Sequence, residues 1–227
     1  MSKLLLLHGA VGSSTQFEIL GEKLKDTFDV CLLNFTGHGG KPIPEEPFSI
    51  AMFAEDVIYF LEKNRLNNVN VYGYSMGGYV ALYIARNFPG KINKIFTTGT
   101  KFNWNEETSL KESKLLNPEK IIEKIPKFAQ ELALRHSPED WKIVLSKTAE
   151  MMIELGKNKI LKDEDFSLTE NEVQVSVGDR DNMVTIEETA DVYKKLKNGR
   201  LIVMPDTPHP IEKIKLERLV NEIKLFF

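Results

Sequence analysis

The sequence has 227 residues, enough for one large domain with a full hydrophobic core. Its formal net charge of −3 provides neither a basic surface for nucleic acid nor a polybasic segment for a membrane. The single cysteine, Cys31, excludes an internal disulfide. The run of leucines after Lys3 is too short for a signal peptide, and no segment approaches the roughly 20 apolar residues of a membrane span. We therefore expect a cytoplasmic protein that binds neither nucleic acid nor membrane; its oligomeric state is not indicated.

Short apolar segments alternate with helical segments through the first hundred residues. Strands are expected in four runs of apolar or β-branched residues, each typical of a strand buried on both faces. These runs are residues 3–8, 29–34, 69–72 and 94–99. Helices are expected from Ser13 to about Lys25, from about Ser49 to Lys63, and from Val80 to the Phe88-Pro89-Gly90 stop. The alternation predicts an α/β fold with a parallel sheet and helices on both faces.

The alternation stops between about Asn103 and Leu168. Three helical stretches are expected there, at about 106–116, 119–135 and 138–156, with Pro126 kinking or interrupting the second. The sheet then resumes with strands at 172–177 and 199–204, separated by a helix at about 185–197 and followed by a terminal helix. Helices inserted between sheet strands are typical of a cap over a site. The expected division is therefore a core of residues 1–102 and 169–227, with a helical cap of residues 103–168.

One turn carries a recognisable catalytic pattern, Gly73-x-Ser75-x-Gly77, placed between an expected strand and an expected helix. A serine used as a nucleophile must stand clear of the backbone on a sharp turn, and flanking glycines let strand and helix pass closely. At the start of that helix, the N–H of Met76 is free to point at a developing oxyanion. An ordinary glycine-rich turn is the alternative, but the strand, the helix and Gly78 all favour the catalytic interpretation.

An acid and a histidine follow Ser75 along the chain, each just past the end of an expected strand, which is where open α/β sheets place their sites. Serine, acid and histidine in that order are typical of α/β-hydrolases. His209 is the candidate base, because it lies between two prolines in an irregular loop with no packing explanation. Three acids lie near the right strand ends: Asp179, Asp181 and Asp206.

The chain resembles the α/β-hydrolase family along its whole length, most closely its small capped esterases and lactonases. Besides the serine turn, the resemblance rests on three loops: His8-Gly9-Ala10, Thr36-Gly37-His38-Gly39 and Gly178-x-x-Asp181-x-x-Val184. It implies that Ala10 supplies the second oxyanion N–H, and the glycine-to-aspartate spacing favours Asp181 as the acid. Asn34 stands where the family usually has aspartate. The family's N-terminal antiparallel strand pair is not expected here, leaving about six mainly parallel strands.

The resemblance implies a serine hydrolase that cleaves a small, largely apolar carboxylic ester or lactone. Ser75 would attack the carbonyl, His209 would take its proton, and Asp181 would hold the imidazole. The N–H groups of Ala10 and Met76 would stabilise the oxyanion. The same fold and triad also serve C–C bond hydrolases, cofactor-free haloperoxidases and a menaquinone-pathway lyase. From a different class, a small-molecule sensor with little turnover remains open, whereas a pure interaction scaffold would be expected to lack Ser75 or His209.

The expected partner is a small-molecule substrate, with four candidate substrate-binding residues: Tyr74, His38, Trp141 and Met152. The stripe containing Trp141 and Met152 is also typical of ordinary helix packing. Hydrogen bonds to loop backbone are the favoured role for the rings of His8 and His38. His136 ends an expected helix, where a cation would favour the helix dipole. No His, Asp or Cys cluster has metal-ligand spacing, so we expect no metal and no cofactor.

Overall fold

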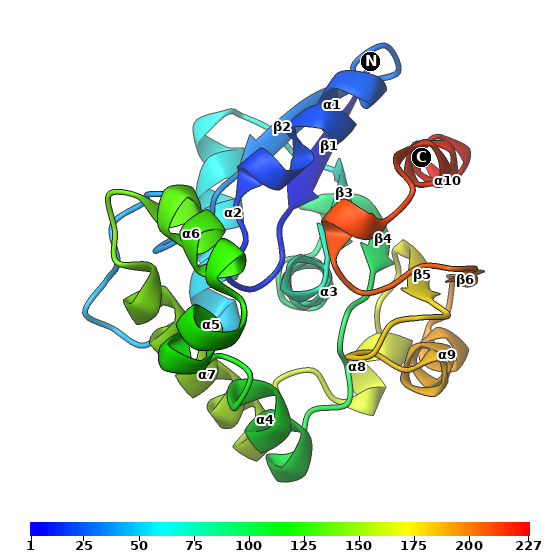
Figure 1. Ribbon diagram of the computed structural model, residues 1–227. Coiled ribbons are helices and arrows are strands. Elements are labelled where there is room, and N and C mark those ends of the chain that lie inside the picture. Colours follow the sequence, from blue (N-terminus) through cyan, green and yellow to red (C-terminus); the bar gives the residue numbers. More distant parts are fainter.

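The computed structural model describes residues 1–227 and contains one six-stranded sheet in the order β2-β1-β3-β4-β5-β6 (Figure 1). All neighbouring strands run parallel, as the sequence predicts. The strands are β1 (Ser2–Leu7), β2 (Phe28–Leu33), β3 (Val69–Tyr74), β4 (Ile92–Thr98), β5 (Glu172–Gly178) and β6 (Gly199–Met204). Each strand lies within two residues of its expected start.

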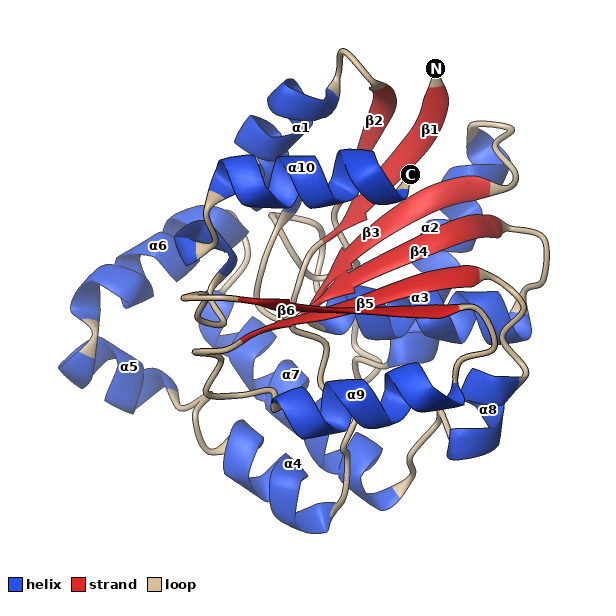
Figure 2. Ribbon diagram, turned by 90° about the vertical axis from the view of Figure 1, so that its right-hand side faces the viewer, coloured by secondary structure: helices blue, strands red, loops and turns tan.

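Helices cover both faces of the sheet, which explains why the strand sequences are apolar without alternation. Along β1, Leu4 and Leu6 face one core and Leu5 and Leu7 face the other. The first core is closed by α1 (Glu18–Leu24) and α10 (Leu216–Phe226). The second is closed by α2 (Ile50–Lys63), α3 (Met76–Asn87) and α9 (Ile186–Lys195). Figure 2 shows α1 and α10 on one side of the sheet and α3 and α9 on the other.

The chain contains two short 3₁₀ helices. The helix expected from Ser13 begins instead as a 3₁₀ turn, η1 (Ser14–Phe17), and becomes α-helical only at Glu18. A second turn, η2 (Ile211–Lys213), follows the loop that holds His209. None of the helices combines the length and the hydrophobicity that crossing a membrane requires.

Five helices lie between β4 and β5 in the chain, and no strand interrupts them. They are α4 (Glu106–Ser113), α5 (Pro118–Lys124), α6 (Pro126–His136), α7 (Trp141–Lys157) and α8 (Asp163–Ser167). The expected helix at 119–135 is divided in two by Pro126, because the residue before it, Ile125, is forced out of the helical region to φ −139° and ψ 60°. The short polar α8 has no apolar periodicity and was not expected. The first four of these helices lie together beside the sheet (Figure 1).

Candidate active site

Ser75 joins β3 to α3 in a conformation that few non-glycine residues adopt. Its φ is 51° and its ψ is −118°. The backbone is held from both sides: the Ser75 N–H donates to the Thr98 carbonyl at 2.8 Å, and the Ser75 carbonyl accepts from Thr100 Oγ1 at 2.9 Å. Such strain persists only where the surroundings enforce it, and it is typical of functional sites.

The glycines around Ser75 allow the close passage of strand and helix that the sequence pattern predicts. A Cβ on Gly73 would lie 2.5 Å from the Cα of Gly78. A Cβ on Gly77 would lie 2.2 Å from the Leu7 carbonyl oxygen at the end of β1. Neither position has room for a side chain, so the turn depends on glycine at both.

Asp181 and His209, 28 residues apart, are joined by a hydrogen bond of 2.7 Å between Oδ2 and Nδ1. Asp181 follows β5 and His209 follows β6, and their side chains are 2% and 9% exposed. The other Asp181 oxygen accepts the backbone N–H groups of Met183 and Val184 at 2.9 and 2.8 Å, which fixes the carboxylate. With Nδ1–H donating to Asp181, the lone pair of the neutral imidazole lies on Nε2.

The two other candidate acids lie elsewhere. Asp179 Oδ1 accepts from the backbone N–H of Thr207 at 3.2 Å, so this carboxylate shapes the loop before His209. Asp206 forms an exposed ion pair with Lys215 at 3.5 Å. Asp181 is thus the acid that the structure brings to His209.

The His209 loop is also tied to β3. The Tyr74 hydroxyl donates to the His209 carbonyl at 3.0 Å, and the two ring centroids are 5.5 Å apart. Burial raises the pKa of the Tyr74 hydroxyl, which therefore remains a protonated donor. No hydrogen bond joins the Ser75 hydroxyl to the His209 ring in this structure.

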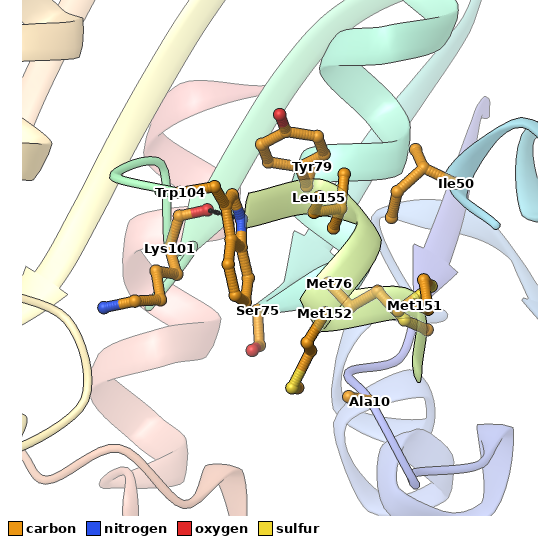
Figure 3. Close-up of a pocket in the computed structure, with 10 residues that line it drawn as sticks. All are labelled: Ala10, Ile50, Ser75, Met76, Tyr79, Lys101, Trp104, Met151, Met152 and Leu155. Carbon is orange, nitrogen blue, oxygen red and sulfur yellow. Dashed lines mark hydrogen bonds between the residues drawn. The ribbon is translucent and has the colours of Figure 1, made fainter. Parts of the chain in front are cut away.

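A small cavity of about 40 Å³ lies beside Ser75 (Figure 3). Helix α7 contributes Met151, Met152 and Leu155 to its wall. The other walls come from Ala10, Ile50, Met76, Tyr79, Lys101 and Trp104. The Lys101 ammonium points away from the cavity and donates to the Met183 carbonyl at 2.9 Å, so the wall beside Ser75 is largely apolar.

Two backbone N–H groups at this cavity have no protein acceptor. Met76 is the first residue of α3, so its N–H has no partner within the helix. The N–H of Ala10, in the loop after β1, donates to no backbone carbonyl. The structure therefore places Ala10 and Met76, the two predicted oxyanion donors, on the wall that also contains Ser75.

Of the four candidate substrate-binding residues, only Met152 lines the cavity. Tyr74 points to the opposite face of the sheet, into the core closed by α1 and α10. His38 is fully buried against Phe48 and Phe53, with ring centroids 5.3 and 5.4 Å away. Trp141 packs in a cluster between α6 and α7. These three side chains fill the protein interior rather than the cavity.

The rings of His8 and His38 hold loop backbone, as expected. His8 Nδ1 donates to the Gly9 carbonyl at 2.8 Å while its Nε2 accepts the Phe35 N–H at 3.2 Å. His38 Nδ1 lies 3.0 Å from the Thr36 carbonyl. Burial lowers the pKa of His8 well below its usual value and that of His38 to about 3, so both rings are neutral.

The expectation that His136 acts as a cation at a helix end is wrong. Its ring is fully buried, and its Nδ1 accepts the Gly39 N–H at 3.2 Å. A protonated ring could not accept that bond, and burial lowers the His136 pKa. The neutral ring uses Nε2 to donate to the Val11 carbonyl at 3.0 Å.

Asn34, which stands where the family usually has aspartate, links two loops at this end of the sheet. Its Oδ1 accepts the Ser14 N–H at 2.7 Å and its Nδ2 lies 3.4 Å from the Gly39 carbonyl. An ionised aspartate accepts but does not donate, so only the amide can make both contacts.

Most cavity-lining residues were not predicted as site residues. Met151 and Leu155 belong to the apolar face of α7. Their helical spacing with Met152 was the one feature of the sequence that indicated a shared face. Trp104 and Lys101 lie in an irregular segment after β4, where periodicity carries no information. No group of three or more His, Cys, Asp or Glu side chains is gathered closely enough to hold a metal ion.

Comparison with known proteins places the chain in a family. A family model described as alpha/beta hydrolase fold matches residues 3–133, more than half of the sequence, and the chain belongs to this family. A pimeloyl-[acyl-carrier protein] methyl ester esterase of Neisseria meningitidis is 30% identical over 100 residues, 44% of this chain and 37% of that enzyme. The chain matches only 27–37% of the length of such curated relatives.

Solved structures share the fold over the whole chain. An esterase from Thermogutta terrifontis superimposes with a TM-score of 0.75 at 21% identity, covering 100% of this chain and 89% of the esterase. An enol-lactonase from Burkholderia xenovorans does so with a TM-score of 0.76 at 15% identity, covering 99% and 90%. At these identities the similarity establishes the α/β-hydrolase fold.

Proposed function

We propose that this protein is a serine hydrolase that cleaves a small carboxylic ester or lactone through an acyl-enzyme. The observation that carries the proposal is the buried 2.7 Å hydrogen bond between Asp181 and His209, at the same edge of the sheet as the strained Ser75 turn. A carboxylate that orients an imidazole at the same strand edge as a half-buried serine is the arrangement that activates a serine hydroxyl.

In the proposed reaction, Ser75 Oγ attacks the substrate carbonyl while His209 Nε2 takes the hydroxyl proton. Asp181 keeps the remaining proton on Nδ1 and stabilises the imidazolium. The N–H groups of Ala10 and Met76 stabilise the oxyanion, each contributing a factor on the order of 10²–10³ in rate. His209 must close on Ser75 for this step, and catalytic hydrogen bonds often tighten only in the substrate complex.

The tetrahedral intermediate then collapses to the acyl-enzyme. His209 Nε2 donates its proton to the departing alkoxide, which leaves as an alcohol, or stays attached as the free hydroxyl when the substrate is a lactone. His209 next deprotonates a water that attacks the acyl carbonyl, and the carboxylic acid leaves as Ser75 regains its proton.

The cavity supports a small acyl group. Its volume of about 40 Å³ corresponds to only a few water-sized spheres of roughly 10–15 Å³ each. Its walls near Ser75 are apolar, which favours an alkyl group over a charged one. The N. meningitidis relative is named for a methyl ester and the B. xenovorans neighbour for a lactone, and both are carboxylic esters.

We further propose that residues 103–168 form a cap over a core of residues 1–102 and 169–227. The support is that α7 supplies one wall of the cavity while Ser75 supplies another. A substrate larger than the present cavity would require α7 to move away from Ser75. Acyl-chain preference therefore reports on how this segment packs.

The test is turnover of p-nitrophenyl acetate, butyrate and octanoate by the wild-type protein and by Ser75→Ala. We expect hydrolysis that falls as the acyl chain lengthens and that is abolished in the variant. Saturable binding of such esters without turnover by a folded wild-type protein would contradict the proposal and favour the sensor interpretation.

A further inference from the structure

The loop that carries Ala10 has a strained residue directly after it. Gly9, Ala10, Val11 and Gly12 form a tight turn in which the Gly12 N–H donates to the Gly9 carbonyl at 3.1 Å. Val11, the third residue of the turn, has a φ of 51°. Glycine or asparagine is favoured at such a position, and a β-branched residue is a genuine outlier there. Something outside the turn must hold this conformation.

Two side chains from the end of α6 hold the Val11 carbonyl. Arg135 Nη1 donates to this oxygen at 3.2 Å and His136 Nε2 donates to it at 3.0 Å. The His136 donor is itself fixed, because its Nδ1 accepts the Gly39 N–H at 3.2 Å and the proton must lie on Nε2. Both residues are more than 120 positions away from Val11 in the sequence, with separations of 124 and 125.

Arg135 also contacts the segment that follows His209. Its Nη2 lies 3.5 Å from Glu212 Oε1, and the Arg135 side chain is only 13% exposed. Glu212 belongs to η2, three residues after His209, and it accepts from Gln16 Nε2 at 2.7 Å. The end of α6 therefore contacts the loop of Ala10 and the segment that follows His209.

We propose that Arg135 and His136 are positioning residues that hold the Val11 carbonyl and thereby aim the Ala10 N–H at the oxyanion. This inference rests on the function proposed above. Without these two donors, Val11 relaxes toward negative φ and the turn that presents Ala10 changes shape. The helical segment between β4 and β5 then contributes to the rate as well as to the shape of the cavity.

Two substitutions at one position separate the two bonds of His136. In His136→Asn the amide oxygen replaces Nδ1 as acceptor for Gly39, but the shorter side chain does not reach Val11. In His136→Gln the longer amide still donates to Val11. We expect His136→Asn to lower kcat for p-nitrophenyl acetate about 10–100-fold with KM within about twofold, and His136→Gln to retain most of kcat. Arg135→Ala is expected to lower kcat by a smaller factor.

A second substitution tests whether the effect passes through Val11. Glycine adopts positive φ without steric cost, so adding Val11→Gly to His136→Asn should restore a large part of the lost kcat. A purely structural role for His136 would give no such rescue, and urea unfolding of each variant shows whether it is folded.

The outcomes distinguish the positioning role from the proposed function. The positioning role is overturned if kcat is unchanged in a folded His136→Asn, or if Val11→Gly does not relieve the loss of kcat. The serine-hydrolase proposal still stands in that case, provided that the wild-type protein turns over substrate and Ser75→Ala does not. A wild-type protein without turnover overturns both.

Discussion

Backbone strain is concentrated where side chains of the site are presented. Of the five non-glycine residues with positive φ, Val11, Ser75 and Asp206 lie in loops that follow strands β1, β3 and β6. Each costs on the order of 1–3 kcal/mol and persists only when neighbouring contacts enforce it. At Ser75 those contacts are hydrogen bonds to the Thr98 carbonyl and the Thr100 hydroxyl, and at Val11 they come from α6. The rigidity of the site is therefore built from several elements.

We expect the activity to depend on the Asp181 carboxylate. Asp181→Asn removes the charge that stabilises the imidazolium and disturbs the His209 tautomer, so kcat for an aryl ester should fall about 10³–10⁴-fold. Asp179→Asn is the matched control, because asparagine still accepts the Thr207 N–H through its amide oxygen. That variant should stay within about threefold of wild type. The reverse pattern in steady-state kinetics would assign the acid to Asp179.

Site residues in the loops after strands could be predicted from the sequence. Contacts between residues far apart in the sequence could not. Ser75 was predicted from the G-x-S-x-G pattern between an expected strand and an expected helix, and His209 from its place in an irregular loop past the last expected strand. Asp181 was favoured over two other acids near strand ends by its spacing from Gly178. The bonds of Arg135 and His136 to Val11 depend on how α6 docks, and helical periodicity does not report docking. His136 was misinterpreted for that reason. Its position at a helix end can be predicted from neighbouring residues, whereas its burial depends on residues far away in the sequence.

Helices α4 and α7 pack closely against each other where Gly156 faces Ser109. A Cβ on Gly156 of α7 would lie 2.1 Å from Ser109 Oγ and 2.7 Å from the Asn105 carbonyl oxygen. Lys101 ties α4 to the core, because its Nζ lies 3.7 Å from Glu112 of α4 and 3.7 Å from Glu188 of α9. The wall that α7 contributes to the cavity is thus positioned through α4.

Two helical glycines should respond in opposite directions to the same substitution. Gly156→Ala forces α4 and α7 apart and should lower the unfolding free energy by about 1–3 kcal/mol. Gly21 lies in α1, where an added Cβ would meet only Val30 Cγ1 at an ordinary 3.5 Å. Gly21→Ala should therefore raise the unfolding free energy by about 0.5–1 kcal/mol, since alanine is the better helix former. Urea denaturation measures both, and a neutral Gly156→Ala would refute the close packing.

Element types could be predicted from the sequence more fully in the core than in the inserted segment. Buried parallel strands are short apolar runs bounded by glycine-rich loops, and all six were found. In the segment 103–168, the break at Pro126 was visible but α8 was not, because Asp163–Ser167 is a single polar turn without an apolar repeat.

At the scale of the whole molecule, three buried histidine rings lie where the sheet loops meet α6. The His38 centroid lies 5.3 Å from that of His8 and 5.7 Å from that of His136. Burial lowers all three pKa values, so these rings stay unprotonated in the folded protein at pH values where they are protonated in the unfolded chain. Stability from these rings is fully present above the usual histidine pKa of about 6.5 and is lost as the pH falls below it.

His38 allows this pH dependence to be measured. Because its pKa is about 3 in the folded protein, His38 takes up one proton on unfolding when the pH lies between about 3 and 6.5. The unfolding free energy therefore falls by about 1.4 kcal/mol for each pH unit below 6.5 in this interval. His38→Asn removes the titration while its amide still donates to the Thr36 carbonyl. The loss of stability between pH 7 and pH 5 should be about 2 kcal/mol smaller in this variant. An identical pH dependence in the two proteins would show that the pKa of His38 is the same in the folded and unfolded states.

Covalent labelling with a small fluorophosphonate probe, read by intact mass, tests whether Ser75 is an activated nucleophile. We expect one added probe per chain in the wild-type protein and none in Ser75→Ala, with labelling slowed strongly in Asp181→Asn. A folded wild-type protein that takes no label, or a Ser75→Ala variant that is labelled as fast as wild type, would contradict this expectation.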